Sequence, residues 1–356
     1  FVGAAVGAAL GEVLLNPLYD LVRFIRQRYA RNVHAANTRL QENVSSRDKE
    51  ARTARGLLLS YLGALALITL MVIASNANNL FIYSPDVGLH LPPTLQYAHG
   101  LTHGTIVRDE VVSAALGGQV KEFLVYLPPS YKTAQGKTKR YPTFYLLHGT
   151  PGKDSDWFTG GKADQAADTL IALGKIPELI MILPDGNGRP GQTSEWGNSY
   201  DQHQNFETYV STDLVKYVDG KYRTLADAAH RGIAGQSMGG FGAMNIAVHH
   251  HDIFGYVSSL GGYYRAEGSI WENNTTYMHK NSPIEVLPSD KQAWHLYMYI
   301  GAATNDQPYY TYAKQFVQEL GNLHIRYQFD VEDGSHSWHI WQIQIYHTLL
   351  WLHWGS

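Results

Sequence analysis

One serine of this chain lies in a setting that could make it a nucleophile. Ser237 is flanked by glycines in the stretch RGIAGQSMGGFG, residues 231–242. The pattern G-x-S-x-G carries chemistry when it joins a buried strand to a helix, because the serine then projects from a sharp, strained turn. The pattern alone is a weak signal. The residues around it must therefore decide whether Ser237 is a nucleophile or part of an ordinary glycine-rich turn.

The flanking residues predict a strand, a tight turn and a helix. Residues 230–234 are short and apolar enough for a buried strand, and apolar residues recur at helical spacing from Gly239 onward. Gly235 and Gly239 stand where a side chain would collide as the strand and the helix approach each other. We therefore expect Ser237 at the point where this strand turns into a helix.

A serine hydroxyl needs a neighbouring base, normally a histidine that is oriented by a carboxylate. In α/β-hydrolases the three residues follow the chain order serine, acid, histidine, and such sites gather at the carboxyl ends of strands. Asp306 follows a predicted strand over 295–300, and His336 follows one over 325–331. The sequence therefore predicts a catalytic triad of Ser237, Asp306 and His336.

Other residues compete for these roles. His339 lies three residues beyond His336, inside a predicted helix, where it would face a different direction. Asp330 and Asp333 are poorer acids because they share the strand or loop of the histidine. The histidine run 249–251 ends a predicted helix, where charge complementarity with the helix dipole is expected over a metal cluster.

Stabilisation of a developing oxyanion requires two backbone N–H groups. Met238, the residue after the nucleophile, supplies one. The second is expected from Thr150, because FYLLHGTPG (144–152) ends a predicted strand in a loop of small residues. His148 and Gly149 would shape this turn, with His148 also a candidate for substrate binding. An ordinary β-turn is the alternative reading of this segment.

Strands and helices alternate from Gly104 to the end of the chain. This alternation indicates an α/β fold with a mainly parallel sheet that is covered on both faces. Strands are predicted over 105–113 and 119–127 (a hairpin with its turn near Gly117), 142–147, 179–183, 230–234, 254–260, 295–300 and 325–331, and helices over 162–173, 206–217, 239–250, 309–320 and 338–351.

The N-terminal region predicts membrane attachment. Residues 56–75 form a run of twenty residues without a charge, long enough to cross a bilayer, although a buried core helix is the alternative. Residues 1–22 are a second candidate helix. Residues 23–55 hold nine Arg/Lys against three acids, as expected of a cytoplasmic loop. With 76–103 as a linker, the domain over 104–356 would then lie outside the cytoplasm.

Composition excludes several classes of function. The net charge of −3 and the pI near 6.6 argue against a nucleic-acid partner. The chain has no cysteine, which excludes a thiol nucleophile and a thiolate metal site. No metal or cofactor is expected, and the expected partners are membrane lipids and a small-molecule or lipid ester.

Five stretches in this order carry a family resemblance: LVYLPPSY, YLLHGTPG, ILPDGNG, AGQSMGGFGAM and GSHSWHIW. Over about residues 104–354 the chain resembles the putative-esterase family of α/β-hydrolases, which includes esterase D-like enzymes, feruloyl esterase domains and the antigen 85 mycolyltransferases. The resemblance implies the same triad and the same two oxyanion amides. PDGNGRPGQTSEW (184–196) is similar to a sugar-binding wall of antigen 85, which implies that Asp185 and Trp196 border the substrate cleft.

The chain also departs from that family. Mycolyltransferases carry a glutamate where Asp306 stands, and residues 263–288, with Trp271 and Tyr277, have no counterpart and are expected to form a lid or an acyl-binding wall. We expect a membrane-anchored serine esterase. The alternatives are an acyltransferase acting on a sugar or lipid hydroxyl, and a non-catalytic binding module attached to the membrane.

Overall fold

The computed structural model describes residues 20–28, 56–66 and 102–354, which fall into two compact units, Phe1–Ser84 and Pro85–Ser356. In the first unit, residues 20–28 and 56–66 are helical. The helix over 20–28 extends into the segment expected to be a basic loop. Among the described residues, no helix combines the length and apolarity needed to cross a bilayer. Residues 1–19 and 67–75 of the predicted spans, and residues 76–101 of the linker, lie outside the described residues.

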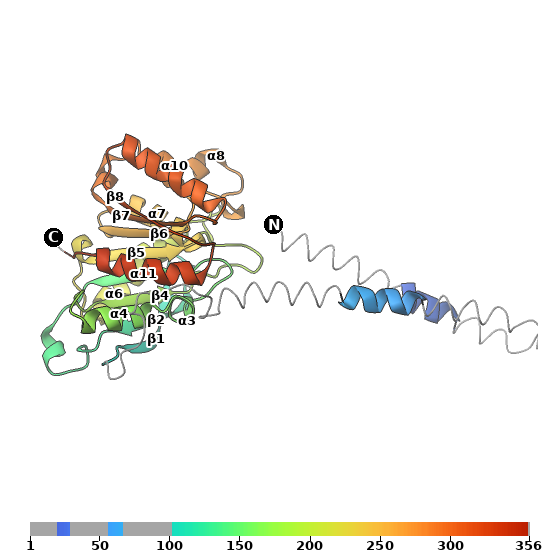
Figure 1. Cartoon of the computed structure of the whole chain (residues 1–356), viewed down its shortest axis with the longest axis horizontal. Helices are drawn as coiled ribbons and strands as arrows, with labels where there is room; N and C mark the ends of the chain where they lie inside the picture. The colour runs from blue at the N-terminus through green and yellow to red at the C-terminus, as the bar shows by residue number, and fades with distance from the viewer. Residues whose placement is uncertain (1–19, 29–55, 67–101, 355–356) are drawn as a thin grey trace, which may run out of the picture. The chain divides into compact units, whose positions relative to one another are not determined.

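The second unit is built on one eight-stranded sheet (Figure 1). Its strand order is β1-β2-β4-β3-β5-β6-β7-β8. The central strands are therefore joined by crossover connections and not by hairpins. The strands are β1 (Thr105–Ser113), β2 (Gln119–Leu127), β3 (Thr143–Leu147), β4 (Ile180–Pro184), β5 (Arg231–Gln236), β6 (Tyr256–Leu260), β7 (Tyr297–Ala303) and β8 (Tyr327–Glu332).

The sheet begins with the predicted hairpin and continues as the predicted parallel array. β1 pairs antiparallel with β2, and the turn between them places Gly117 and Gly118 at φ values of 68° and 83°, which glycine adopts without strain. β2 pairs antiparallel with β4, and every further pair, from β4 through β8, is parallel. The expected α/β class is confirmed.

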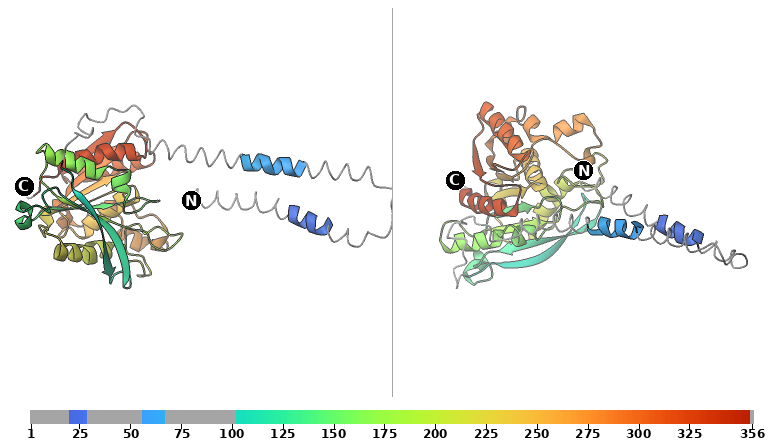
Figure 2. Two further views of the ribbon diagram at one scale, coloured as in Figure 1. Left: turned by 90° about the horizontal axis from the view of Figure 1, so that it is seen from below. Right: turned by 45° about the vertical axis from the view of Figure 1, so that its right-hand side comes forward.

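Helices cover both faces of this sheet. α4 (Ala163–Ala172) and α11 (Trp338–Trp351) contact each other, and α11 packs on β6 and β7. Figure 2 shows α4 and α11 on one face and α6 (Val215–Lys221) on the other. α7 (Met238–His249) packs against β3, β5 and β6, and α10 (Tyr309–Asn322) against β7 and β8.

Apolar strand sequences explain why the sheet is fully covered. β3 (TFYLL) and β4 (IMILP) are buried at every position, the pattern expected of strands with a helix layer on each face. The helix predicted over 206–217 is divided into α5 (Phe206–Thr208), a π-helical turn (Tyr209–Leu214) and α6. Burial on both faces fixes the carboxyl ends of the central strands, where the site residues lie.

Short helices fill the segment between β6 and β7. They are Ser269–Trp271, α8 (Thr275–Lys280), α9 (Pro283–Val286) and Lys291–His295. Trp271 and Ile270 of this segment are buried with Tyr263 against Phe241 of α7. Part of the segment expected to be a lid or wall is therefore packed as a small second core.

Candidate active site

Ser237 lies at the sharp turn between β5 and α7. Its φ and ψ are 55° and −121°, a region that costs a non-glycine residue on the order of 1–3 kcal/mol. The Ser237 N–H donates to the carbonyl of Leu260 at 2.9 Å, and its own carbonyl accepts from Gly240 N–H at 2.9 Å. The strained backbone is thus held by the neighbouring strand β6 and by the first turn of α7.

The two glycines around Ser237 are required by close packing, as predicted. A Cβ on Gly235 would lie 2.1 Å from the carbonyl oxygen of Gly239, and a Cβ on Gly239 would lie 2.3 Å from the carbonyl oxygen of Leu147. Both obstacles are backbone atoms, which cannot move aside cheaply. The turn at Ser237 therefore requires residues without a side chain at positions 235 and 239.

Two adjacent loops bring an acid and a histidine together. β7 and β8 are neighbours, and their loops pair through Thr304 N–H to Glu332 O at 3.0 Å and Asn305 N–H to Gly334 O at 2.8 Å. In consequence His336 Nδ1 lies 2.8 Å from Asp306 Oδ2. The Asp306 side chain is 4% exposed and that of His336 is 29% exposed. Asp306 therefore fixes one ring nitrogen of His336 and leaves Nε2 for another partner.

The competing acids have other partners. Asp333 accepts from the Thr304 hydroxyl at 2.7 Å, so it fastens the loop that carries Asp306. Asp330 accepts from the Tyr299 hydroxyl and lies 3.2 Å from His347 Nδ1. These contacts leave Asp306 as the carboxylate that meets His336.

His339 lies inside α11, as its spacing predicted. Its Nε2 is buried and has no hydrogen-bond partner among the described residues. Burial lowers the pKa of His339. It is therefore a poorer base candidate than His336, which has a carboxylate on one nitrogen.

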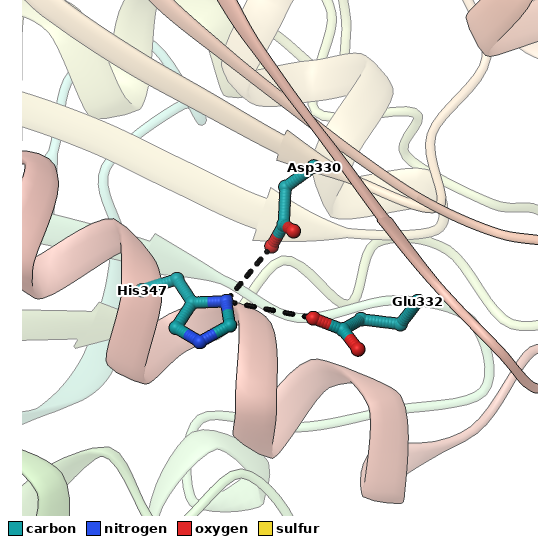
Figure 3. Close-up of side chains that lie close together, drawn as sticks. All are labelled: Asp330, Glu332 and His347. Carbon is teal, nitrogen blue, oxygen red and sulfur yellow. Dashed lines mark hydrogen bonds and ion pairs between the residues drawn. The ribbon is translucent and has the colours of Figure 1, made fainter.

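Asp330, Glu332 and His347 form the group of described residues with the side-chain types and spacing of a metal site (Figure 3). Their ligand atoms lie within 4.8 Å of one another. The contact with Asp330 raises the pKa of His347 although burial opposes it, and burial raises the pKa of Glu332. The ion pairs of His347 with Asp330 and Glu332, at 3.2 Å and 3.5 Å, are the contacts that hold this cluster together.

The two predicted oxyanion residues lie side by side. The Thr150 hydroxyl contacts the Met238 sulfur at 2.8 Å, which links the loop after β3 to the first residue of α7. Within residues 102–354, the backbone N–H of neither residue is bonded to a protein acceptor. Both amides are therefore free to bind an oxygen atom from a ligand.

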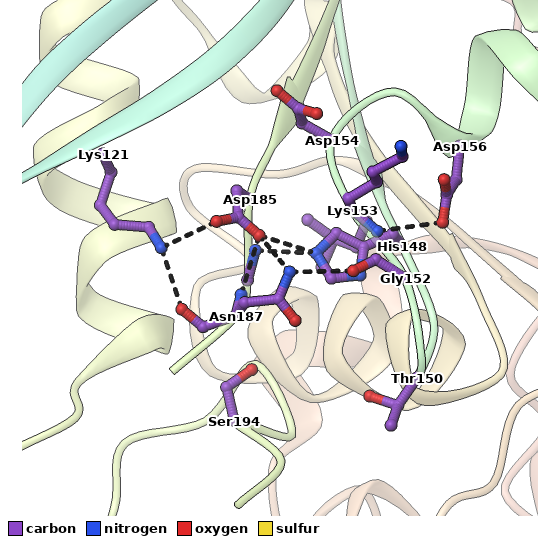
Figure 4. A network of polar contacts seen from close by, with 12 residues as sticks. Lys121, His148, Thr150, Gly152, Lys153, Asp154, Asp156, Asp185, Asn187 and Ser194 are labelled. Carbon is purple, nitrogen blue, oxygen red and sulfur yellow. Dashed lines mark hydrogen bonds and ion pairs between the residues drawn. The ribbon is translucent and has the colours of Figure 1, made fainter. Parts of the chain in front are cut away.

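His148 is the centre of a polar network under this loop (Figure 4). It is 1% exposed. Its Nδ1 lies 2.8 Å from the Gly149 carbonyl, and its Nε2 accepts from the Gly186 N–H at 2.9 Å. These partners assign the proton to Nδ1. His148 was expected to shape the turn, and it does; its burial makes direct contact with a substrate a poor fit.

Asp185 joins the same network from the end of β4. Its carboxylate meets Lys121 Nζ at 3.2 Å and Asn187 Nδ2 at 2.6 Å, and Asn187 Nδ2 also donates to the Gly152 carbonyl at 2.8 Å. Burial alone would raise the pKa of Asp185, but its contacts with Lys121 and with the Asn187 N–H outweigh burial and lower that pKa well below its usual range. Asp185 thus helps to hold the loop that carries Thr150.

Trp196 packs beneath the loop that carries His148. Its indole is fully buried, its Nε1 donates to the His148 carbonyl at 2.9 Å, and its ring lies where side chains on Gly186 and Gly242 would otherwise be. The prediction that Trp196 borders the cleft does not fit this position, because no part of the ring is exposed. The sequence could not show this, since burial depends on the left-handed backbone at Trp196, with φ of 51°.

The histidine run after α7 binds a buried acid. His249 Nδ1 and His250 Nε2 each lie 3.0 Å from Glu207 Oε1. Burial would raise the pKa of Glu207, but the two imidazoles lower it to about 2. The two imidazoles thus hold a buried carboxylate at the end of α7, and Glu207 was not predictable because it comes from a distant helix.

Sequence reasoning missed two aromatic residues that touch His336, which are Tyr309 and Trp341. The ring of Tyr309 stacks on His336 with the centroids 4.3 Å apart and the planes at 20°. Tyr309 follows Asp306 by three residues, at the first position of α10. That spacing was the available signal.

Comparison with known proteins is decisive for the family. Residues 113–352 match the family described as Putative esterase. The chain belongs to this esterase family.

The curated relatives match only part of this chain. An endo-1,4-beta-xylanase/feruloyl esterase of Xylanibacter ruminicola is 33% identical over 50% of this chain and 25% of its own length. Esterase Rv1288 of Mycobacterium tuberculosis is 36% identical over 39% of this chain and 28% of its own length. The MPT51/MPB51 antigen of Mycobacterium bovis is 30% identical over 37% of this chain and 39% of its own length. The chain thus spans less than half the length of these relatives.

Solved structures support the fold over most of the domain. A ferulic acid esterase superposes with a TM-score of 0.63 at 28% identity, covering 70% of this chain and 98% of that one. The feruloyl esterase module from Clostridium thermocellum superposes with a TM-score of 0.59 at 21% identity, covering 77% of this chain and 97% of the module. The chain therefore has an α/β-hydrolase-like sheet, as expected.

Proposed function

We propose that this protein is a serine esterase that cleaves a carboxylic ester through an acyl-enzyme, with Ser237 as nucleophile. The observation that carries this proposal is the 2.8 Å contact between His336 and Asp306, on the loops of two adjacent strands at the carboxyl edge of the sheet where Ser237 also lies. Esterase relatives and the strained backbone at Ser237 support the same assignment.

The chemistry follows from these positions. His336 takes the proton of the Ser237 hydroxyl as its oxygen attacks the ester carbonyl, and it then returns the proton to the leaving alcohol. Asp306 holds the tautomer with the proton on Nδ1 and stabilises the imidazolium. The amides of Thr150 and Met238 bind the developing oxyanion. Water activated by His336 then hydrolyses the acyl-enzyme and restores Ser237.

Hydrolysis of a p-nitrophenyl ester tests this proposal. The Ser237→Ala variant of the full chain is expected to lose at least about 10³-fold in kcat because the nucleophile is gone. Ser335→Ala is the matched control, because Ser335 is an exposed serine beside His336, and it is expected to retain wild-type activity. Equal activity of wild type and Ser237→Ala would reject the proposal.

Acyl transfer is the second candidate function. It is favoured by the similarity to the MPT51/MPB51 antigen and by the resemblance to antigen 85 mycolyltransferases. The acyl-enzyme would be the same, but a sugar or lipid hydroxyl would replace water as the acceptor. Incubation with an acyl ester with and without trehalose or glycerol separates the two: an acyl-sugar or acylglycerol product formed in preference to free acid favours transfer.

For the substrate we propose a lipid or cell-envelope ester presented outside the cytoplasm, with the N-terminal region attached to the membrane. The uncharged run over 56–75 and the basic segment 23–55 support this attachment. In the described part of that run, five leucines are 44% to 69% exposed: Leu57, Leu58, Leu59, Leu62 and Leu65. Feruloyl esterase relatives make an aromatic acyl group the alternative.

Two measurements test these finer points. Proteolysis of intact cells is expected to digest the domain over 104–356 while a cytoplasmic marker stays intact; a domain protected until lysis would contradict the topology.

Lipid profiling of cells with wild type or Ser237→Ala, together with hydrolysis of methyl ferulate, separates lipid from aromatic substrates. Accumulation of an envelope ester in the variant is the expected result.

A further inference from the structure

Tyr309 is tied to the backbone that carries Asp306. It opens α10 directly after Pro308, and the N–H of the next residue, Tyr310, donates to the Asp306 carbonyl at 2.7 Å. The first turn of α10 and the acid are therefore one local unit. Any side chain at position 309 has a fixed position relative to Asp306.

The imidazole of His336 is enclosed by two aromatic rings. Tyr309 covers its face, with 4.3 Å between centroids and 20° between planes, and Trp341 meets it edge-on, with 4.8 Å and 88°. The hydrogen bond from Nδ1 to Asp306 fixes one nitrogen but leaves the ring able to rock about that contact. Stacking removes this freedom, because rocking would separate the two ring planes.

The phenol of Tyr309 is half-buried. Burial and the nearby Asp306 carboxylate raise its pKa. The phenol therefore stays protonated over the working range of an esterase. Tyr309, His336 and Ser237 are each partly exposed, whereas Asp306 is buried.

The segment expected to be a lid supports Tyr309 from the other side. The ring of Tyr263 lies 6.3 Å from that of Tyr309 at 44° and stacks on Phe241 of α7 at 4.7 Å. The Tyr263 hydroxyl donates to the buried carboxylate of Glu195. Tyr309 is therefore backed by a buried aromatic layer and cannot retreat from His336 without repacking it.

We propose that Tyr309 is a positioning residue whose ring fixes the plane of the His336 imidazole and, with it, the direction in which Nε2 points. This proposal rests on the proposed esterase function. An aromatic face over an imidazole also favours the charged form that appears when the base takes a proton. The consequence is a contribution to the chemical step and not to substrate affinity.

Two substitutions separate the ring from the hydroxyl. Tyr309→Leu removes the stacked ring and is expected to lower kcat about tenfold or more while KM changes less than about threefold. Tyr309→Phe keeps the ring and is expected to restore kcat to within about threefold of wild type. The control is Tyr312→Leu, one turn along the same helix, where the ring touches Tyr309 edge-on; its kcat is expected to stay within about twofold.

Labelling of the full chain by a fluorophosphonate provides a second readout. Tyr309→Leu is expected to be labelled about tenfold more slowly than wild type, and Tyr309→Phe at nearly the wild-type rate. Should wild type and Tyr309→Leu label equally fast, the positioning role is wrong and the esterase assignment stands. Absence of labelling in wild type would reject both. If Tyr309→Leu lowers the melting temperature, Tyr309→Met, which fills a similar volume, replaces it.

A loss shared equally by Tyr309→Phe and Tyr309→Leu would overturn the proposal, because it would assign the effect to the Tyr309 hydroxyl and not to the stacked ring. An increase in KM with unchanged kcat would also overturn it, since the residue would then bind substrate and not position the base.

Discussion

Two of the histidine–aspartate pairs among the described residues differ in their expected role. His336 meets Asp306 at 2.8 Å, and His347 meets Asp330 at 3.2 Å. The first pair lies on the loops after β7 and β8, at the edge of the sheet that holds Ser237. The second joins the strand β8 to the body of α11. A histidine–carboxylate contact is thus not itself a sign of catalysis; its place relative to the carboxyl ends of the strands decides.

The surroundings of the two pairs differ as well. Asp306 is 4% exposed and has the single histidine as its partner for Oδ2, whereas Asp330 is 17% exposed and His347 also lies 3.5 Å from Glu332. Ion pairs that are open to water contribute only about 0–1 kcal/mol to stability. We therefore expect the first pair to govern rate and the second to make a small contribution to stability.

The largest contrast is expected from replacing each histidine. His336→Gln is expected to lower kcat by at least about 10³-fold, because no base remains to accept the Ser237 proton. His347→Gln is expected to stay within about twofold of wild type. Hydrolysis of a p-nitrophenyl ester measures both, and a similar loss in the two variants would abolish the distinction between the pairs.

Replacing the acids should give a smaller contrast. Asp306→Asn is expected to lower kcat by about 10² to 10⁴-fold, because the amide can no longer hold the required tautomer of His336. Asp330→Asn is expected to have little effect on kcat. Asp333→Asn serves as the loop control, since Asp333 binds Thr304; a loss as large as that of Asp306→Asn would move the acid role to Asp333.

The loop with Thr150 allows a third comparison. Asp185→Asn weakens the contacts to Lys121 and is expected to lower kcat about tenfold, less than the 10²–10³-fold typical of deleting an oxyanion donor outright. Asp154→Asn is the matched control, because Asp154 lies in the same loop as Thr150 but pairs with Arg108 at 2.7 Å. Equal effects of the two substitutions would indicate a general loss of loop structure.

The smallest expected effect is that of His347→Gln on the free energy of unfolding, and it depends on pH. The folded-state pKa of His347 is raised by Asp330, so its contribution is fully present below about pH 6.5, its unfolded value, and is lost as pH rises through the folded value. In urea unfolding at pH 6, His347→Gln is expected to cost about 0.5–1 kcal/mol. At pH 9 wild type and variant should agree. A cost that persists at pH 9 would mean that packing, and not charge, explains it.

Much of the fold was predictable because burial on two faces leaves strong apolar patterns. The hairpin strands 105–113 and 119–127 and the helix 338–351 were predicted with the bounds that the structure shows. Asp306 and His336 were also predictable to be neighbours, because adjacent parallel strands place their following loops at one edge of the sheet.

The remaining features depend on contacts that no local pattern encodes. Trp196 looks like a cleft residue in sequence, yet its left-handed backbone turns it into the interior. Glu207 meets His249 and His250 only because α5 packs beside the end of α7. Tyr309 lies three residues after Asp306, but only the three-dimensional path of α10 shows that its ring covers His336.

The central claim is that His336, held by Asp306, activates Ser237. The most direct test is the rate of fluorophosphonate labelling of the full chain, with the modified residue located by mass spectrometry. The account predicts rapid labelling on Ser237 in wild type, at least about 10²-fold slower labelling in His336→Gln, and no change in His347→Gln. Labelling on another residue, or an unchanged rate in His336→Gln, would contradict it.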